Sequence, residues 1–213
     1  MSQGRAILAV MNHGDDGPVQ TIADYVHVEE HSEIKHEFID GVIRAMSGGT
    51  LEHSRLASAV IVTLSNLLRA AGRPCVVLTS DARVHVEAAN VITYPDVSVV
   101  CGPSVSRGPD PHALHNPLVI VEVTSPSTER YDRGRKFARY RRLPSLQEYV
   151  LVSHRERLIE VFRRGPAGDA GGDDTDGWPL AARGLAGQQV ELTSIGCRLS
   201  VDDIYDDPRA LTS

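Results

Sequence analysis

The sequence predicts an α/β (α+β) protein in which helices flank a central β-sheet. Residues 94–100 and 118–124 form two nearly continuous apolar runs, which is typical of central strands covered on both faces. Residues 50–71 repeat leucine and valine at four-residue spacing, which predicts an amphipathic helix. The chain has 213 residues, 41% of them hydrophobic, enough for one domain with a sizeable core. We expect a loose N-terminal segment over residues 1–18 and a single domain over residues 19–213.

The first elements of this domain are expected to be a short helix and a hairpin. Thr21 is a suitable N-cap for a helix that reaches about Glu30. Residues 36–46 predict a hairpin, because Asp40-Gly41 is a strong two-residue turn signal between two apolar segments.

Further elements are expected on both sides of the two central strands. The helix over residues 50–71 ends where Gly72 and Pro74 interrupt the pattern. Residues 83–87 alternate strictly, which predicts a strand with one exposed face. A flexible, acidic loop is expected over residues 165–177. The remaining strands are expected over residues 75–79, 146–152 and 158–162.

The overall charge and the cysteines exclude some classes of protein. The formal net charge of −6 argues against a surface coated in positive charge, although it allows a local basic groove. Cys75, Cys101 and Cys197 are far apart and form no CxxC pair, so no zinc knuckle or redox motif is predicted. Such cysteines fit a reducing cytoplasm. No apolar run approaches the roughly 20 residues of a membrane span, so no membrane association is expected.

Two acidic residues within the apolar runs give the best indication of function. Asp96 and Glu122 would be costly in hydrophobic strands unless a partner compensates them. Together with Lys136, they suggest a divalent metal such as Mg²⁺ or Mn²⁺ and a phosphate substrate. Two structural alternatives stay open: Asp96 could cap a turn after Pro95, and Glu122 could form a buried ion pair with a basic residue.

A basic helix is expected over about residues 132–142. Four-residue spacing would place Asp132, Lys136 and Tyr140 on one face. The local excess of positive charge would attract a polyanion and make its binding salt-dependent, although a solvated helix face is the usual interpretation of such a run. The candidates for nucleic-acid contacts are Arg133, Arg139 and Arg142.

Other histidines carry less information. His112 and His115 lie in a loop near Cys101, but their spacing to other candidate ligands does not predict a metal site.

Several short motifs, taken in order and with their spacing, resemble the Uma-two family. This is a family of restriction-endonuclease-like proteins in the PD-(D/E)xK nuclease superfamily, whose core is a mixed sheet flanked by helices. The resemblance covers residues 21–204, nearly the whole chain. The matching segments are His36–Gly41, His53, Tyr94–Ser98, Glu122–Thr128, Asp132, Lys136, Tyr140 and Glu148-Tyr149.

The resemblance implies Mg²⁺- or Mn²⁺-dependent hydrolysis of phosphodiester bonds, with DNA as the expected partner. It implies that Asp96 and Glu122, with Glu37, bind the metal. The superfamily's usual lysine would fall at Thr124, and Lys136 on the next helix is expected to replace it.

The resemblance also implies that His53 lines the site. Purely structural roles stay open for Glu37, His53 and Asp132. Glu37 could be only the polar face of a hairpin strand, His53 a surface histidine, and Asp132 a residue favoured by the helix dipole.

Two other functions stay open: a nuclease-fold module that binds nucleic acid or protein without cutting, and a phosphoesterase acting on a small substrate. A homodimer is also conceivable, because duplex cleavage needs two active sites or two turnovers.

Overall fold

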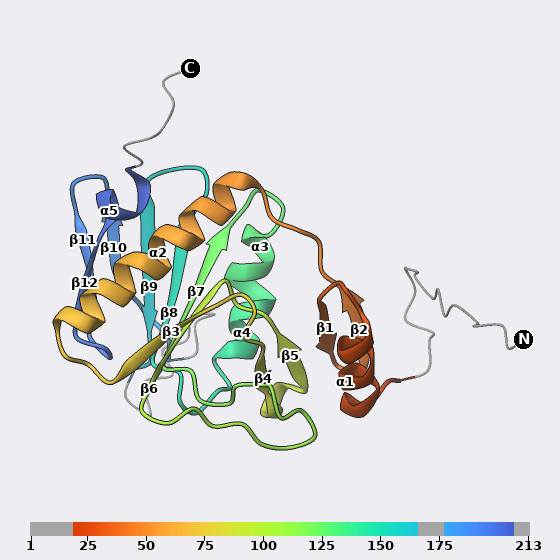
Figure 1. The fold of residues 1–213 in the computed structure, drawn as a ribbon. Coiled ribbons are helices and arrows are strands. Elements are labelled where there is room, and N and C mark those ends of the chain that lie inside the picture. Colours follow the sequence, from red (N-terminus) through yellow and green to blue (C-terminus); the bar gives the residue numbers. More distant parts are fainter. Residues whose placement is uncertain (1–18, 166–176, 207–213) are drawn as a thin grey trace, which may run out of the picture.

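A computed structural model of the chain describes residues 19–165 and 177–206. The expected loose segment over residues 1–18 and most of the expected loop over residues 165–177 lie outside these ranges. The described part contains a six-stranded sheet, a four-stranded sheet and a two-stranded sheet, together with several helices (Figure 1).

The six-stranded sheet is mixed and has the strand order β10-β9-β8-β7-β6-β3. The central pair β7–β8 is parallel and the other pairs are antiparallel. This agrees with the predicted mixed central sheet. Its strands are β3 (Cys75–Thr79), β6 (Val97–Cys101), β7 (Val119–Thr124), β8 (Glu148–Ser153), β9 (Leu158–Arg163) and β10 (Leu180–Leu185).

Alternate side chains of β7 point into two separate hydrophobic cores, one on each face of this sheet. Val119, Val121 and Val123 pack in a cluster with helix α2 (Leu51–Ala70), which crosses one face of the sheet (Figure 1). Ile120 points the other way, into a cluster that includes Phe137 and other aromatic side chains. Because side chains alternate along a strand, Glu122 lies on the same face as Ile120, under the segment that carries Phe137.

That covering segment is the predicted basic helix, although its geometry differs from the prediction. It consists of α3 (Glu129–Tyr131), a π-helical turn η2 (Asp132–Lys136) and α4 (Phe137–Tyr140). Phe137 stacks on Tyr149 of β8, with ring centroids 4.5 Å apart and planes within 9°. Despite the π turn, Asp132, Lys136 and Tyr140 are all buried, as expected of residues on one face.

The four-stranded sheet has the order β2-β1-β5-β4 and lies beside the large one (Figure 1). Its hairpin and the preceding helix α1 (Ile22–His31) are as predicted, and Thr21 forms a capping box with Asp24. Its strands are β1 (His36–Ile39), β2 (Val42–Ala45), β4 (Val84–Val86) and β5 (Val91–Thr93).

Two expectations about this region were wrong. The run over residues 94–100 is not one strand: β5 ends at Thr93, and β6 begins at Val97 in the other sheet. Pro95 interrupts the strand because it lacks the N–H that a ladder needs. In addition, β4 is wholly buried rather than half exposed, because the β6–β7 connection runs along it and Leu114 bridges to Val84.

The sequence analysis also missed the C-terminal elements and a covalent bond. Strands β11 (Gln189–Leu192) and β12 (Cys197–Ser200) form a hairpin, followed by helix α5 (Val201–Tyr205). Cys75 and Cys101, opposite each other on β3 and β6, form a disulfide, whereas the spacing of the cysteines suggested a reducing cytoplasm.

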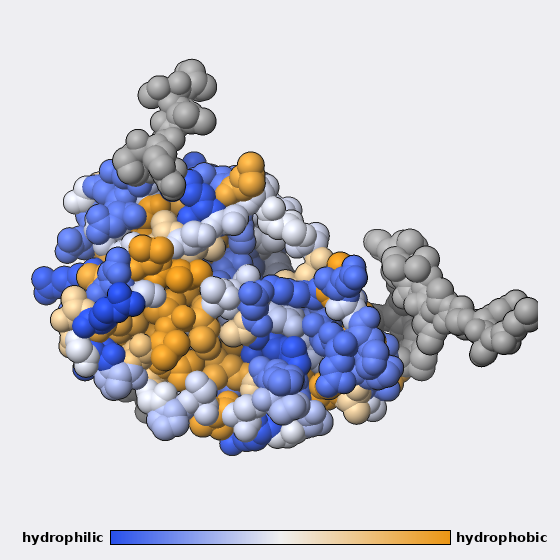
Figure 2. Space-filling view, in the orientation of Figure 1, coloured by the Kyte–Doolittle hydropathy of each residue, from blue (hydrophilic) through white to orange (hydrophobic). Residues whose placement is uncertain are grey.

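Part of the outer surface is apolar. Figure 2 shows apolar side chains gathered on the face that carries α2 and β3, two elements that include the exposed valines Val62 and Val76. In the described part of the chain, no helix is both long enough and apolar enough to cross a membrane.

Candidate functional site

The centre of the candidate site is a buried contact between β7 and the helical segment above it. Lys136 Nζ lies 2.7 Å from Glu122 Oε1, and the hydroxyl of Tyr140 donates a hydrogen bond of 3.1 Å to the same oxygen. Glu122 is 2% exposed and Lys136 8% exposed. The side chain of Lys136 therefore points inward toward Glu122 and not to solvent.

Lys136 and Tyr140 lie on the same side of this helical segment. Lys136 ends the turn and Tyr140 follows one α-helical turn later, and both reach Glu122. Tyr149 of β8 donates a hydrogen bond of 3.0 Å to the carbonyl oxygen of Asp132, at the start of the turn. Single π turns inside helices occur frequently at functional sites, where they redirect a side chain.

Asp96 lies beside Glu122 because of strand register. Val97 of β6 pairs with Val121 of β7 in antiparallel fashion, so the residue before Val97 comes opposite the residue after Val121. The backbone N–H of Val123 donates a 2.8 Å hydrogen bond to Asp96 Oδ2. The break after Tyr94 thus leaves Asp96 as a connector between the two sheets, at the edge of Glu122's strand.

His53 is the second neighbour of Asp96. It lies in the first turn of α2, where Thr50 caps the helix, and its Nε2 is 3.0 Å from Asp96 Oδ2. Gly49 leaves room for the ring, because a Cβ at that position would lie 2.8 Å from His53 Nδ1. The hydrogen bond with Asp96 raises the pKa of His53. Burial alone would raise the pKa of Asp96, but His53 and the positive charge of Lys136 hold it below its usual value.

Glu37 and Asp132 complete a ring of acids around Lys136. Glu37 lies on β1 of the small sheet and accepts a hydrogen bond from the hydroxyl of Thr93. Burial alone would lower the pKa of Lys136, but Glu122, Glu37, Asp132 and Asp96 raise it, so the amine is held positively charged. Burial raises the pKa of Glu122, and Asp96 and Asp132 add to that rise while Lys136 opposes it.

The carboxylates of this cluster are the candidates for holding a divalent cation. Four carboxylates act on a single lysine in a poorly solvated place. Within the described ranges, Asp96, Glu122 and Glu37 do not form a set of three whose ligand atoms all lie within 4.8 Å of one another. Mg²⁺ and Mn²⁺ can bind through only one or two carboxylates when waters complete the coordination, so two of these acids would suffice as protein ligands.

The structure does not bring the three arginine candidates together. Arg133 contacts Glu160 and Glu129, and Arg139 contacts Asp40 and Tyr131. Arg142 is exposed and lines a different pocket, beside His85. A phosphate would have to compete with carboxylates for Arg133 and Arg139.

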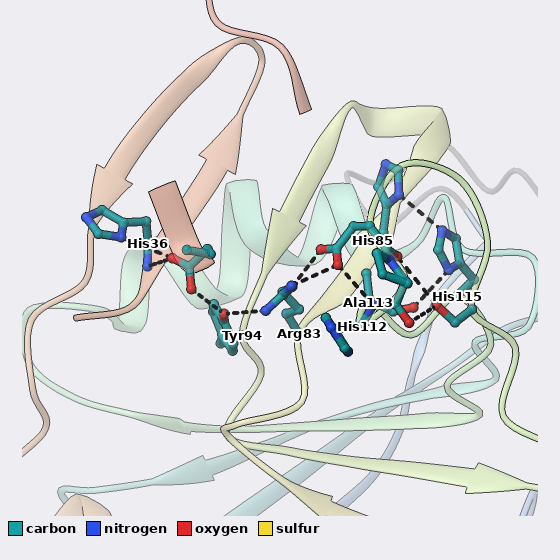
Figure 3. A network of polar contacts seen from close by, with 11 residues as sticks. His36, Arg83, His85, Tyr94, His112, Ala113 and His115 are labelled. Atoms are coloured by element: carbon teal, nitrogen blue, oxygen red, sulfur yellow. Dashed lines mark hydrogen bonds and ion pairs between the residues drawn. The ribbon is translucent and has the colours of Figure 1, made fainter. Parts of the chain in front are cut away.

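A second group of possible metal ligands, missed by the sequence analysis, lies in that pocket. His85, Glu87 and His115 each offer one ligand atom, and these atoms all lie within 4.8 Å of one another. Figure 3 shows His85 and His115 in contact at the end of a polar network, with their rings edge-on at 62°. His85 is on β4, and His115 is in the β6–β7 connection, so no sequence spacing links them. Burial, followed by the effect of His115, lowers the pKa of His85.

Comparison with known proteins gives a consistent family relationship. Residues 22–193 match the model of the Uma2 family, described as "Putative restriction endonuclease". Two uncharacterized proteins of Synechocystis are each 35% identical to the chain. One match spans 195 residues, 91% of this chain and 96% of the relative, and the other spans 148 residues, 68% of this chain and 81% of the relative.

A solved structure is similar in fold. It is described as "a putative nuclease belonging to DUF820 from Anabaena variabilis". It matches with a TM-score of 0.63 and 18% identity, over 88% of this chain and 98% of that one. At this identity the likeness concerns the fold alone.

Proposed function

The chain belongs to the Uma2 family, and from that premise we propose that it is a metal-dependent endonuclease that hydrolyses phosphodiester bonds in DNA. The observation that supports the proposal is that Asp96, directly before β6, lies opposite Glu122 of β7, with the buried amine of Lys136 beside Glu122. A buried cluster of titratable groups with shifted pKa values is typical of a functional site.

Each residue has a proposed role. Asp96 and Glu122, assisted by Glu37, would hold Mg²⁺ or Mn²⁺. Both hydrogen bonds to Asp96 reach Oδ2, and in the described part of the chain no hydrogen bond reaches Oδ1, so Oδ1 is the proposed ligand atom. When bound, the metal would neutralise charge that develops on the phosphate and lower the pKa of a water molecule.

Lys136 would orient the attacking water or hold a phosphate oxygen. Its neighbouring acids keep it protonated, which suits a hydrogen-bond donor and a positive charge rather than a general base. Tyr140 fixes Glu122 by donating to Oε1, and His53 fixes Asp96 by contacting Oδ2. We assign both as positioning residues.

The test is cleavage of linear and supercoiled DNA by the purified protein in Mg²⁺, Mn²⁺ or EDTA. We expect cleavage with either cation and none in EDTA. Lys136→Met removes a preorganised donor, which costs on the order of 100-fold in rate. Asp96→Asn removes a carboxylate ligand of the metal and should lose at least as much.

Matched controls come from the pair Lys35–Asp81, which has the same chemistry at the surface. Lys35→Met and Asp81→Asn should keep the wild-type rate. Circular dichroism must show that all variants are folded. Cleavage that persists in both site variants, or that survives EDTA, would contradict the assignment.

One observation favours a second candidate function. The contact between Lys136 and Glu122 is also what a purely structural buried ion pair would give, the alternative that the sequence left open. In that case the protein would be a nuclease-fold module that binds nucleic acid or a protein without cutting. Wild-type protein that binds DNA, remains folded and cleaves nothing with any divalent cation would favour this function.

A further inference from the structure

The pocket around His85 is separate in chemistry and position from the carboxylate cluster. It measures about 80 Å³ and is lined by residues of β4, the following turn η1 (Glu87–Ala89), the β6–β7 connection and the end of the basic helix. Its ligating groups are two imidazoles and one carboxylate. Such a nitrogen-rich set suits transition metals, whereas Mg²⁺ prefers oxygen ligands.

We propose that His85, Glu87 and His115 form a second metal site, which takes Zn²⁺ or a similar transition metal. The ligand spacing supports this directly. Zinc binds nitrogen at about 2.0–2.1 Å with tetrahedral geometry, which puts two ligand atoms about 3.3 Å apart. His85 Nδ1 and His115 Nε2 are 3.1 Å apart, and His115 Nε2 is 3.5 Å from Glu87 Oε1.

The hydrogen bonds of His115 prepare it as a ligand. Its Nδ1 lies 3.1 Å from the carbonyl oxygen of Ala113, an acceptor, so Nδ1 carries the proton and Nε2 presents its lone pair toward His85 and Glu87. Metal-binding histidines typically hold their other ring nitrogen in this way. His85 and His115 are 4% and 5% exposed, so both rings are fixed by packing.

The fourth coordination position is left to solvent. Glu87 is exposed, and the pocket has room for a water molecule beside the ion. Three protein ligands with one open position is the arrangement of exchangeable and catalytic zinc sites rather than of closed structural ones. Bound metal would join the β6–β7 connection to β4, since His115 lies on the first and His85 on the second.

Arg107 would weaken metal binding, and this provides a test. Arg107 Nε lies 3.3 Å from Glu87 Oε1 and competes for the carboxylate. The Arg107 side chain is 59% exposed, so Arg107→Ala should not disturb the fold. It should tighten metal binding several-fold, a gain that misfolding cannot imitate.

The experiment measures Zn²⁺ binding and Co²⁺ absorption on the full chain. His27 and His31 form an exposed pair one helical turn apart that could also bind metal, so all proteins carry His27→Gln and His31→Gln. With excess Mg²⁺ present to occupy the carboxylate centre, we expect one equivalent of Zn²⁺ per chain, tetrahedral Co²⁺ bands, and at least a tenfold loss of affinity in His85→Asn, His115→Asn and Glu87→Gln. Exposed His112→Asn is the matched control and should bind as the parent does.

The result also separates this site from the proposed nuclease centre. Asp96→Asn and Glu122→Gln should leave Zn²⁺ affinity unchanged. No stoichiometric Zn²⁺ binding by the parent, unchanged affinity in Glu87→Gln, or weaker binding in Arg107→Ala would overturn the proposal whatever the cleavage assays give.

Discussion

At the scale of single residues, the pair Arg83–Asp110 shows how the small sheet and the β6–β7 connection are held together. Arg83 donates from Nε to Asp110 Oδ2 at 2.6 Å and from Nη2 to Oδ1 at 2.8 Å. Asp110 is fully buried. The pair belongs to a network that continues through Tyr94 to Glu29 (Figure 3). Such a two-pronged pair fixes geometry as well as charge.

Breaking this pair from one side should be costly. Asp110→Asn leaves the guanidinium of Arg83 without its counter-charge, and removal of one partner of a buried pair costs about 3–5 kcal/mol. Urea unfolding at pH 7 should show a loss of this size. The double variant Arg83→Met/Asp110→Asn should lose less than the sum of the single losses. Additive losses would mean that the two side chains do not interact in solution.

The same pair predicts a direction for pH. Burial alone would raise the pKa of Asp110, but the hydrogen bonds from Arg83 and the backbone of His112 lower it from 3.8. A depressed folded pKa contributes stability above the unfolded pKa and loses it as pH falls through the folded value. The gap between wild type and Asp110→Asn should therefore be constant from pH 7 to about 5 and shrink below about pH 4. A gap that widens in acid would contradict this assignment.

At the scale of elements, the helical segment over residues 129–140 contains a glycine with no evident structural purpose. Gly134 lies within the π turn, its φ is negative, and a Cβ there would meet nothing within 4 Å. Glycine inside a helix costs roughly 0.5–1 kcal/mol relative to alanine. Gly134→Ala should therefore raise the free energy of unfolding by up to about 1 kcal/mol and the melting temperature by roughly 2–4 °C.

Calorimetry on Gly134→Ala and on a matched control checks this prediction. Gly184 is the control, because a Cβ there would lie 2.8 Å from Val190 Cγ1, and Gly184→Ala should destabilise. Destabilisation by Gly134→Ala would mean that the π turn needs the backbone freedom of glycine.

The elements that sequence could predict are those whose signal is local. The capping residue Thr21, the Asp40-Gly41 turn and the four-residue repeat of α2 each act within a few residues, and each element forms where expected. Strands such as β10 escaped prediction, because alanine, arginine and glycine break its apolar pattern and its pairing with β9 decides the outcome.

The same reasoning explains which site residues could be predicted from the sequence. Glu122 could be singled out because a carboxylate in an apolar strand demands a partner, whatever the fold. Lys136 could be proposed as its partner, whereas the π turn that ends at Lys136 has no sequence pattern that predicts it. His85 and His115 meet only because a long connection returns along β4, and the Cys75–Cys101 bond depends equally on strand register.

At the scale of the whole molecule, charge bears on how DNA could approach. The chain carries a net charge of −6, and two of the three arginines expected to contact DNA, Arg133 and Arg139, are paired with carboxylates. The site itself gathers four acids around one lysine. Without a cation, the carboxylates of the site would repel the phosphates of DNA. Few of the three candidate arginines are then available to neutralise phosphates, so the release of DNA counter-ions should add little affinity.

We therefore expect divalent metal to control binding as well as cleavage. Lys136→Met, expected to cut slowly, should bind a short duplex at least tenfold more tightly in Mg²⁺ than in EDTA at equal ionic strength, as measured by fluorescence anisotropy. Glu122→Gln in the same background should remove most of that gain, because a cation ligand is lost. Arg142→Ala should weaken binding similarly in both buffers, since an exposed arginine contacts phosphate without the metal. Equal affinity in Mg²⁺ and EDTA would instead support the module that binds without cutting.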